Sequence, residues 1–223
     1  MKRRVAILIS GRGSNMAALI KAAQVDDYPA EIVVVISNRA DAPGLEKAKA
    51  SGVATAVVES RPFGKDRAAF EAALQAVLDQ HRVELICLGG FMRLFTAGFV
   101  QRWYGRMLNI HPSLLPSFPG LDPHGQALRA GVKISGATVH FVIPETDAGP
   151  ILMQGAVGVS DHDTSETLSE RILEVEHRIY PDALRLLATG AVRLDGDICK
   201  TPDSAGSGNF LISPVGSADG SSA

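Results

Sequence analysis

Short runs of apolar, β-branched residues alternate with stretches of helical periodicity, and this alternation constrains the fold more than any other feature of the chain. Such runs predict strands over residues 5–10, 31–37, 54–59, 85–88 and 107–110. The stretches between them predict helices over residues 16–24, 44–51, 65–80 and 97–103. Strands that alternate with helices build an α/β fold, here a doubly wound, mostly parallel sheet with helices on both faces.

The pattern changes after Pro119. Residues 136–143 and 151–159 predict longer strands joined by a loop that contains Asp147, so the C-terminal part is expected to be partly antiparallel. Residues 164–187 then predict one long helix.

Capping residues set the expected limits of that helix. Asp163 or Thr164 is suited to the N-cap, and Gly190 to the stop. Pro181 is expected to kink or interrupt the helix, because proline has no backbone N–H to donate.

Residues 1–200 are expected to form a single domain, since 223 residues with 46% hydrophobic content bury a sizeable core. Residues 201–223 are rich in Ser and Gly and predict a flexible tail. Cys87 and Cys199 are too few and too far apart for a disulfide framework or a zinc site, so we expect no metal.

Charge excludes several classes of partner. The formal net charge is −2, without a long basic run, which argues against nucleic acid. No apolar run approaches the roughly 20 residues that a membrane span needs, and the apolar stretch after the N-terminal Lys-Arg-Arg is too short for a signal peptide. We therefore expect a cytoplasmic protein that acts on small molecules.

The segment 107–116, MLNIHPSLLP, places an amide and an imidazole on one strand end. Asn109 and His111 flank one residue, so their side chains leave the same face. Asp147 follows in ETDAGP. An amide donor, an acid/base and a carboxylate are the groups that acyl transfer requires. His-Pro can also simply cap a strand, but the proline-rich loop after it, with Pro112, Pro116 and Pro119, is typical of a rigid loop that holds a site.

A glycine-rich turn follows the first predicted strand. In SGRGSN, residues 10–15, Gly11 and Gly13 permit close backbone approach, and Ser14 and Asn15 open a helix with unpaired N–H groups. This arrangement suits a phosphate monoester, although a tight turn without a ligand is the alternative. The loop is neither a Walker sequence nor a complete G-x-G-x-x-G motif.

These segments resemble the folate-dependent phosphoribosylglycinamide formyltransferases. The resemblance covers residues 4–195 and is carried by an ordered set of motifs: SGRGSN at 10–15, SN at 37–38, GGFMR at 89–93, NIHPSLLP at 109–116, DAGP at 147–150 and EHRIYP at 176–181. It implies a Rossmann-like fold and transfer of a formyl group from 10-formyltetrahydrofolate to the amine of glycinamide ribonucleotide, in purine biosynthesis.

The resemblance also implies residue roles. Asn109, protonated His111 and Asp147 would act in catalysis, with Asp147 favouring the charged imidazole. The residues that would bind the substrate phosphate and ribose are Gly13, Ser14, Asn15 and Glu176. Those that would bind the folate are Arg67, Met92, Arg93, Leu94, Phe95 and Asn109.

Three other functions are considered: two enzymes that also use formyl-folate, and one binding module without catalytic activity. A methionyl-tRNA formyltransferase is expected to carry an added C-terminal domain, and a formyltetrahydrofolate hydrolase an added N-terminal module. A catalytically silent phosphate-binding module would not need Asn109, His111 and Asp147 together. Ser117 stands where some members of the family have a basic residue, which puts any contact there in question. A homodimer is left open.

Overall fold

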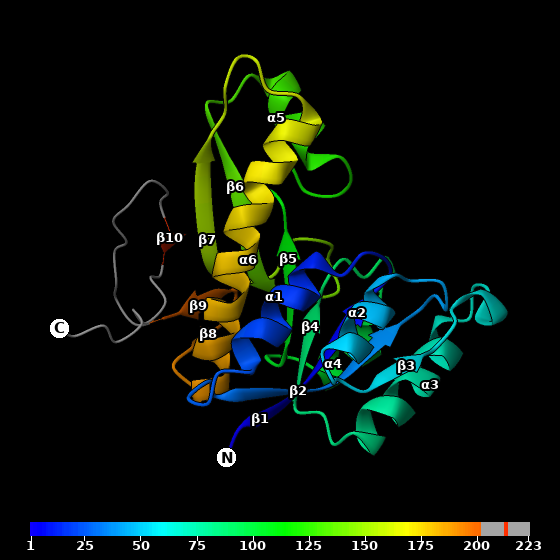
Figure 1. The fold of residues 1–223 in the computed structure, drawn as a ribbon. Helices are drawn as coiled ribbons and strands as arrows, with labels where there is room; N and C mark the ends of the chain where they lie inside the picture. The colour runs from blue at the N-terminus through cyan, green and yellow to red at the C-terminus, as the bar shows by residue number, and fades with distance from the viewer. Residues whose placement is uncertain (202–211, 214–223) are drawn as a thin grey trace. The chain divides into compact units, whose positions relative to one another are not determined.

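The computed structural model describes residues 1–201 and 212–213 (Figure 1). The chain divides into two compact units, one of Met1–Asn109 with Phe141–Glu145, the other of Ile110–His140 with the chain from Thr146 onward. The predicted flexible tail lies outside the described residues, apart from Thr201, Ile212 and Ser213. The single-domain organisation stays a prediction.

The first unit is built on a parallel sheet. Its strands are β1 (Arg3–Ile9), β2 (Ala30–Ser37), β3 (Thr55–Val57), β4 (Leu85–Leu88) and, as far as Asn109, β5 (Met107–His111), in the order β3-β2-β1-β4-β5. Residues 5–9 of β1 are fully buried, because a strand with a neighbour on each side and helices on both faces has no edge or face in water.

Helices cover both faces of this sheet. They are α1 (Ser14–Ala23), α2 (Gly44–Ala50), α3 (Arg67–Gln80) and α4 (Ala97–Arg102), with a short 3-10 turn, η1 (Arg61–Phe63). Ala6 and Leu8 of β1 share a core cluster with α3 and α4, whereas Ile9 lies against the start of α2. Successive residues of one strand therefore face different helices, which confirms the doubly wound prediction.

The strand order reverses at β1. The chain passes from β1 outward to β2 and β3, then returns to the other side of β1 as β4. At such a switch point the loops that follow the two central strands diverge and leave a crevice at the carboxyl edge. Here these loops begin at Ser10 and Gly89.

Buried polar contacts fix the far end of the loop that starts at Gly89. The Glu71 carboxylate of α3 accepts hydrogen bonds from the backbone N–H and the hydroxyl of Thr96, both at 2.5 Å. Thr96 in turn caps α4, and Trp103 Nε1 donates to Gln75 Oε1 at 2.9 Å. Side chains of α3 thus hold both ends of α4, at Thr96 and at Trp103.

The second unit combines an antiparallel hairpin with helices. Strands β6 (Ile134–Phe141) and β7 (Ile151–Gly158) pair antiparallel, as predicted, and β10 (Ile212–Ser213) pairs antiparallel with β7. Helix α6 (Ser165–Thr189) contacts β7 and α5 (Pro123–Ala130), and β8 (Arg193–Asp195) pairs with β9 (Ile198–Lys200). Neither α5 nor the β8–β9 hairpin was predicted from the sequence.

Helix α6 differs from its prediction in one respect. Thr164 is the N-cap, within a capping box with Thr167, and Gly190 ends the helix at φ 73°, both as expected. Pro181 does not interrupt it, because the helix continues to Thr189. Proline removes one hydrogen-bond donor, while buried residues on either side of it, such as Tyr180 and Ala183, hold the helix through packing.

Asp163 anchors the N-terminus of α6, and its replacement tests the anchor. Its side chain, 4% exposed, accepts hydrogen bonds from the Arg171 guanidinium at 2.9 Å, from Ser160 N at 2.7 Å and from the Thr167 hydroxyl at 2.9 Å. These contacts lower the pKa of Asp163 well below its usual range, and the hydrogen bond from Arg171 has the largest effect.

We predict that Asp163→Asn destabilises the protein by about 1–2 kcal/mol at pH 7, as expected for lost hydrogen bonds to a charged group. A carboxylate with a lowered folded pKa stabilises above its unfolded pKa of about 4 and loses this contribution as the pH falls below it. Urea unfolding at pH 7 and pH 3 should therefore show a smaller difference at pH 3. An equal difference at both values would contradict the ionic anchor.

Candidate active site

The second unit brings His111 and Asp147 together from positions 36 residues apart in the numbering. His111 Nδ1 lies 3.4 Å from Asp147 Oδ2, and the two side chains are 7% and 9% exposed. His111 Nε2 lies 2.9 Å from the Phe118 carbonyl oxygen. A carbonyl oxygen only accepts, so Nε2 carries a proton, while Nδ1 faces the carboxylate. This is the arrangement of an acid/base histidine oriented by a carboxylate.

Strained backbone surrounds this pair. Phe118 and Asp147 have φ values of 56° and 53°, in the left-handed region that side chains with a Cβ rarely occupy. The strain is held in place by a hydrogen bond from Gly120 N to Asp147 Oδ2, at 2.9 Å. Backbone in such conformations gathers at functional sites, where the surrounding contacts enforce it.

The hairpin fixes the proline-rich loop that follows His111. The Thr138 hydroxyl of β6 donates to the Ser113 carbonyl at 2.7 Å and accepts from Leu115 N at 3.0 Å. Gln154 Nε2 of β7 donates to the Leu115 carbonyl at 2.9 Å. The loop is therefore irregular but anchored, as the prolines predicted.

Two further histidines lie near the pair. His140, at 2% exposed, places Nε2 3.7 Å from Asp147 Oδ1, so the carboxylate is flanked by two imidazoles. Burial, opposed by Asp122 and reinforced by His111, lowers the pKa of His124. Its Nε2 is buried and has no hydrogen-bond partner among the described residues.

Asn109 lies two residues before His111 on the same strand, β5. Alternation along a strand directs these two side chains to one face and that of Ile110 to the other, and both Ile110 and His111 are buried. Glu176, proposed for the ribose, is 6% exposed in α6.

The glycine-rich turn forms the N-terminus of α1. Gly13 is the N-cap at φ 67°, Ser14 begins the helix, and no side chain caps it. An anion bound there would interact favourably with the helix dipole and with backbone N–H groups of the first turn.

A cavity of about 740 Å³ borders this turn. Its lining comes from the loops after β1, β2, β3 and β4 and includes Gly13, Ser14 and Asn15, the side chains of Arg12, Arg39 and Arg61, and Gly89 and Gly90. Loops at the carboxyl ends of four parallel strands thus share one cavity, where an open α/β sheet is expected to bind its ligand.

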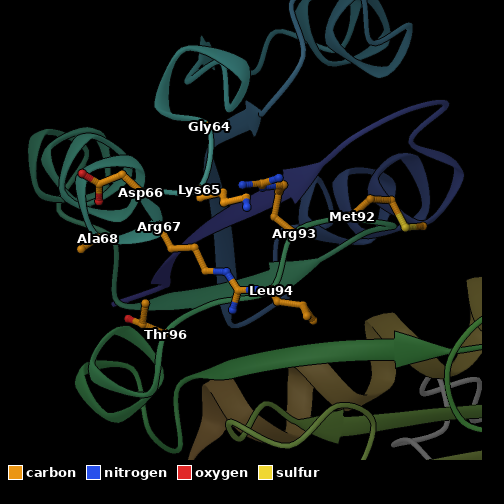
Figure 2. Close-up of a pocket in the computed structure, with 9 residues that line it drawn as sticks. All are labelled: Gly64, Lys65, Asp66, Arg67, Ala68, Met92, Arg93, Leu94 and Thr96. Atoms are coloured by element: carbon orange, nitrogen blue, oxygen red, sulfur yellow. The ribbon is translucent and has the colours of Figure 1, made fainter.

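A second cavity, of about 810 Å³, lies between the start of α3 and the loop after β4 (Figure 2). Arg67, Met92, Arg93 and Leu94, all predicted for the folate, line it together. Lys65 lines it as well and was missed, because no sequence motif marks an isolated lysine. Asp66 is the acidic residue of this lining, and its carboxylate caps α3 by accepting a hydrogen bond from Ala69 N.

Aromatic packing forms one side of this loop. The rings of Phe91, Phe95 and Phe99 stack in sequence, with centroids 5.5 and 4.7 Å apart. The Arg93 guanidinium lies over the Phe70 ring at 5.9 Å, within cation–π range. Phe95 is 9% exposed and lines neither cavity, so its assignment to the folate stays a prediction.

Over the described part of the chain, no group of three or more His, Cys, Asp or Glu side chains could hold a metal ion. Among the same residues, no helix combines the length and the apolar character that crossing a membrane would require.

Comparison with known proteins identifies the class to which this fold and these residues belong. The family model described as formyl transferase matches residues 3–184, and the chain belongs to that family. The phosphoribosylglycinamide formyltransferase of Bacillus subtilis (strain 168) is 40% identical over 185 residues, which cover 83% of this chain and 94% of the relative. The predicted family is confirmed.

Longer relatives contain the same segment. The trifunctional purine biosynthetic protein adenosine-3 of Bos taurus is 52% identical over 200 residues, 89% of this chain but 20% of that protein. The chain thus spans about a fifth of the length of such relatives. The crystal structure of glycinamide ribonucleotide transformylase 1 from Symbiobacterium toebii has a TM-score of 0.87 and 46% identity, and the match covers 91% of this chain and 95% of that one.

Gly13 offers a test of the phosphate turn. A Cβ there would lie 3.1 Å from Met16 Cε and 3.2 Å from Gly44 Cα, at a φ that strains any L residue. We predict that Gly13→Ala raises the Kd for ribose 5-phosphate about tenfold, measured by calorimetry. Gly52→Ala is the control, because Gly52 has a φ of 76° with nothing within 4 Å of a Cβ and lies outside the cavity. Equal effects of the two changes would remove the turn from the site.

Proposed function

We propose that the protein transfers the formyl group of 10-formyltetrahydrofolate to the amine of glycinamide ribonucleotide. The buried contact between His111 Nδ1 and Asp147 Oδ2, at 3.4 Å, carries the proposal. Phosphate or folate binding alone does not require it, whereas acyl transfer needs a group that handles a proton beside the reacting carbon. Membership of the formyl transferase family supports the same reaction.

The reaction would proceed by direct attack. The amine nitrogen forms a bond to the formyl carbon, and the carbonyl electron pair moves onto oxygen. The Asn109 amide and the His111 Nε2–H would donate to this oxyanion. The second donor now hydrogen-bonds the Phe118 carbonyl, so the substrate oxygen would replace that carbonyl as acceptor. Collapse restores the carbonyl and breaks the bond to the folate nitrogen, which takes up the proton that the amine loses.

Asp147 would stabilise the positive charge on His111 and hold its ring in orientation. A covalent acyl-enzyme is unnecessary, since an amine is already a nucleophile. Proton transfer through His111 or through a water held by Asp147 would give the same products.

The cavities suggest where the rest of each substrate binds. We assign the ribonucleotide phosphate to Gly13, Ser14 and Asn15, at the amide-rich start of α1, and the ribose to Glu176. The folate would occupy the cavity lined by Met92 and Leu94, which are 71% and 58% exposed, unusually so for apolar side chains. Arg67 and Arg93, with Lys65, would attract the carboxylates of its tail.

Turnover distinguishes the rival functions. Purified protein is mixed with glycinamide ribonucleotide and 10-formyltetrahydrofolate, and the folate absorbance is followed with and without the ribonucleotide. Loss of the formyl-folate only in the presence of the ribonucleotide supports the transferase. Loss without it identifies a hydrolase, and no loss in either case would refute catalysis.

Asp147→Asn tests the catalytic pair. We predict a fall in kcat of about 10²–10⁴-fold, the usual contribution of a positioned acid/base, with little change in either KM. The neutral amide keeps the shape of the side chain but no longer stabilises a charged imidazole. Asp161→Asn, at an exposed carboxylate that pairs with Lys133, is the control. A kcat near that of the control would exclude Asp147 from the chemistry.

A further inference from the structure

The hydroxyl of Ser10 connects the two loops of the switch point. Ser10 follows the last residue of β1 and is 8% exposed. Its Oγ accepts a hydrogen bond from Met92 N at 2.8 Å and donates one to Asn38 Oδ1 at 2.6 Å. One side chain therefore joins the turn assigned to the phosphate to the loop assigned to the folate.

Asn38 determines the direction of these hydrogen bonds. It is 8% exposed and follows β2, and its Nδ2 donates to Ser60 Oγ at 3.2 Å. Because the amide nitrogen of Asn38 faces Ser60, the amide oxygen faces Ser10 and accepts a hydrogen bond from the Ser10 hydroxyl. A lone pair of Ser10 is then left for the Met92 N–H. Linked hydrogen bonds of this kind strengthen one another.

This chain of hydrogen bonds lies beside both cavities. Ser10, Asn38 and Ser60 line the cavity that contains the phosphate turn, and Met92 lines both cavities. Met92 is 71% exposed, so its own side chain contributes little packing, whereas its neighbours Phe91 and Arg93 contact aromatic rings. At Met92 itself the backbone is held by the hydrogen bond to Ser10.

We propose that Ser10 is a positioning residue that couples the two substrate sites. A phosphate bound at residues 13–15 would order the turn that begins at Ser10, and the ordered hydroxyl would hold Met92 in the position that binds the folate. Coupling of this kind is reciprocal, so the folate would favour ribonucleotide binding by the same factor. The inference rests on the proposed function, because it assigns a ligand to each cavity.

Asn38 and Ser60 would then act through Ser10. A hydrogen bond whose only role is to stabilise the fold would change the affinity for each ligand separately and leave their coupling unaltered. The ratio of two dissociation constants therefore separates positioning from general stabilisation.

The experiment measures that ratio. The Kd of tetrahydrofolate, which carries no formyl group to transfer, is determined by calorimetry with the full chain in the absence and in the presence of saturating glycinamide ribonucleotide. We expect the ribonucleotide to lower the Kd of the wild-type protein at least about fivefold, the lower end of typical coupling. Ser10→Ala should reduce this factor to less than about twofold.

Matched variants keep the test decisive. Ser60→Ala removes the far end of the chain of hydrogen bonds and should reduce the coupling factor less than Ser10→Ala; it carries the test if Ser10→Ala does not fold. Ser51→Ala removes an exposed hydroxyl that donates a hydrogen bond to the Lys47 carbonyl within its own helix end and should leave the factor unchanged.

Two outcomes would overturn the inference: both ligands bind the wild-type protein without coupling, or the factor survives in both Ser10→Ala and Ser60→Ala. Failure of both ligands to bind the wild-type protein would instead refute the proposed function.

Discussion

The central position of β1 is the constraint on which the first unit depends. Parallel neighbours on each side and helices on both faces leave its residues 5–9 no contact with water. The chain leaves this strand at Ser10 without a bulky apolar side chain, and polar groups replace the apolar ones within one residue. The same order that buries β1 brings the loop from Gly89 beside this turn, so core and ligand edge follow from one topology.

In the second unit, irregular backbone rather than a buried central strand positions His111 and Asp147. His111 is the last residue of β5 and Asp147 lies in the loop between β6 and β7, and the pair depends on irregular backbone, at Phe118 and at Asp147 itself, that costs energy to maintain. The hairpin residues Thr138 and Gln154 hold the loop after His111 through hydrogen bonds to the carbonyl groups of Ser113 and Leu115. The residues proposed for catalysis therefore lie beside strained segments, and regular structure next to them restricts the movement of the loop.

Sequence reasoning predicted what depends on periodicity and missed what depends on tertiary contacts. The strands and helices of the first unit, the antiparallel hairpin and the caps of α6 follow from local pattern. Helix α5 starts at Asp122 and Pro123 with few apolar residues, so its signal is weak. Pro181 does not interrupt α6, because burial of the helix outweighs one missing donor, and the alternative of a kink stays a prediction. Asn38 belongs to one of the sequence motifs, but the motif does not show that its side chain forms hydrogen bonds with Ser10 and Ser60, which only the folded structure brings beside it.

The charge that lines one cavity of this protein differs from what its net charge suggests. The net charge of −2 suggests no anionic ligand, yet Lys65, Arg67 and Arg93 line one cavity. Fields from exposed groups are screened beyond about 10 Å at ordinary ionic strength, so a cavity's own side chains decide which ligand it attracts. A nearly neutral protein can thus have locally cationic cavities, and Met92 and Arg93, which line both of them, make the hydrogen bond from Met92 N to Ser10 a direct connection between the two linings.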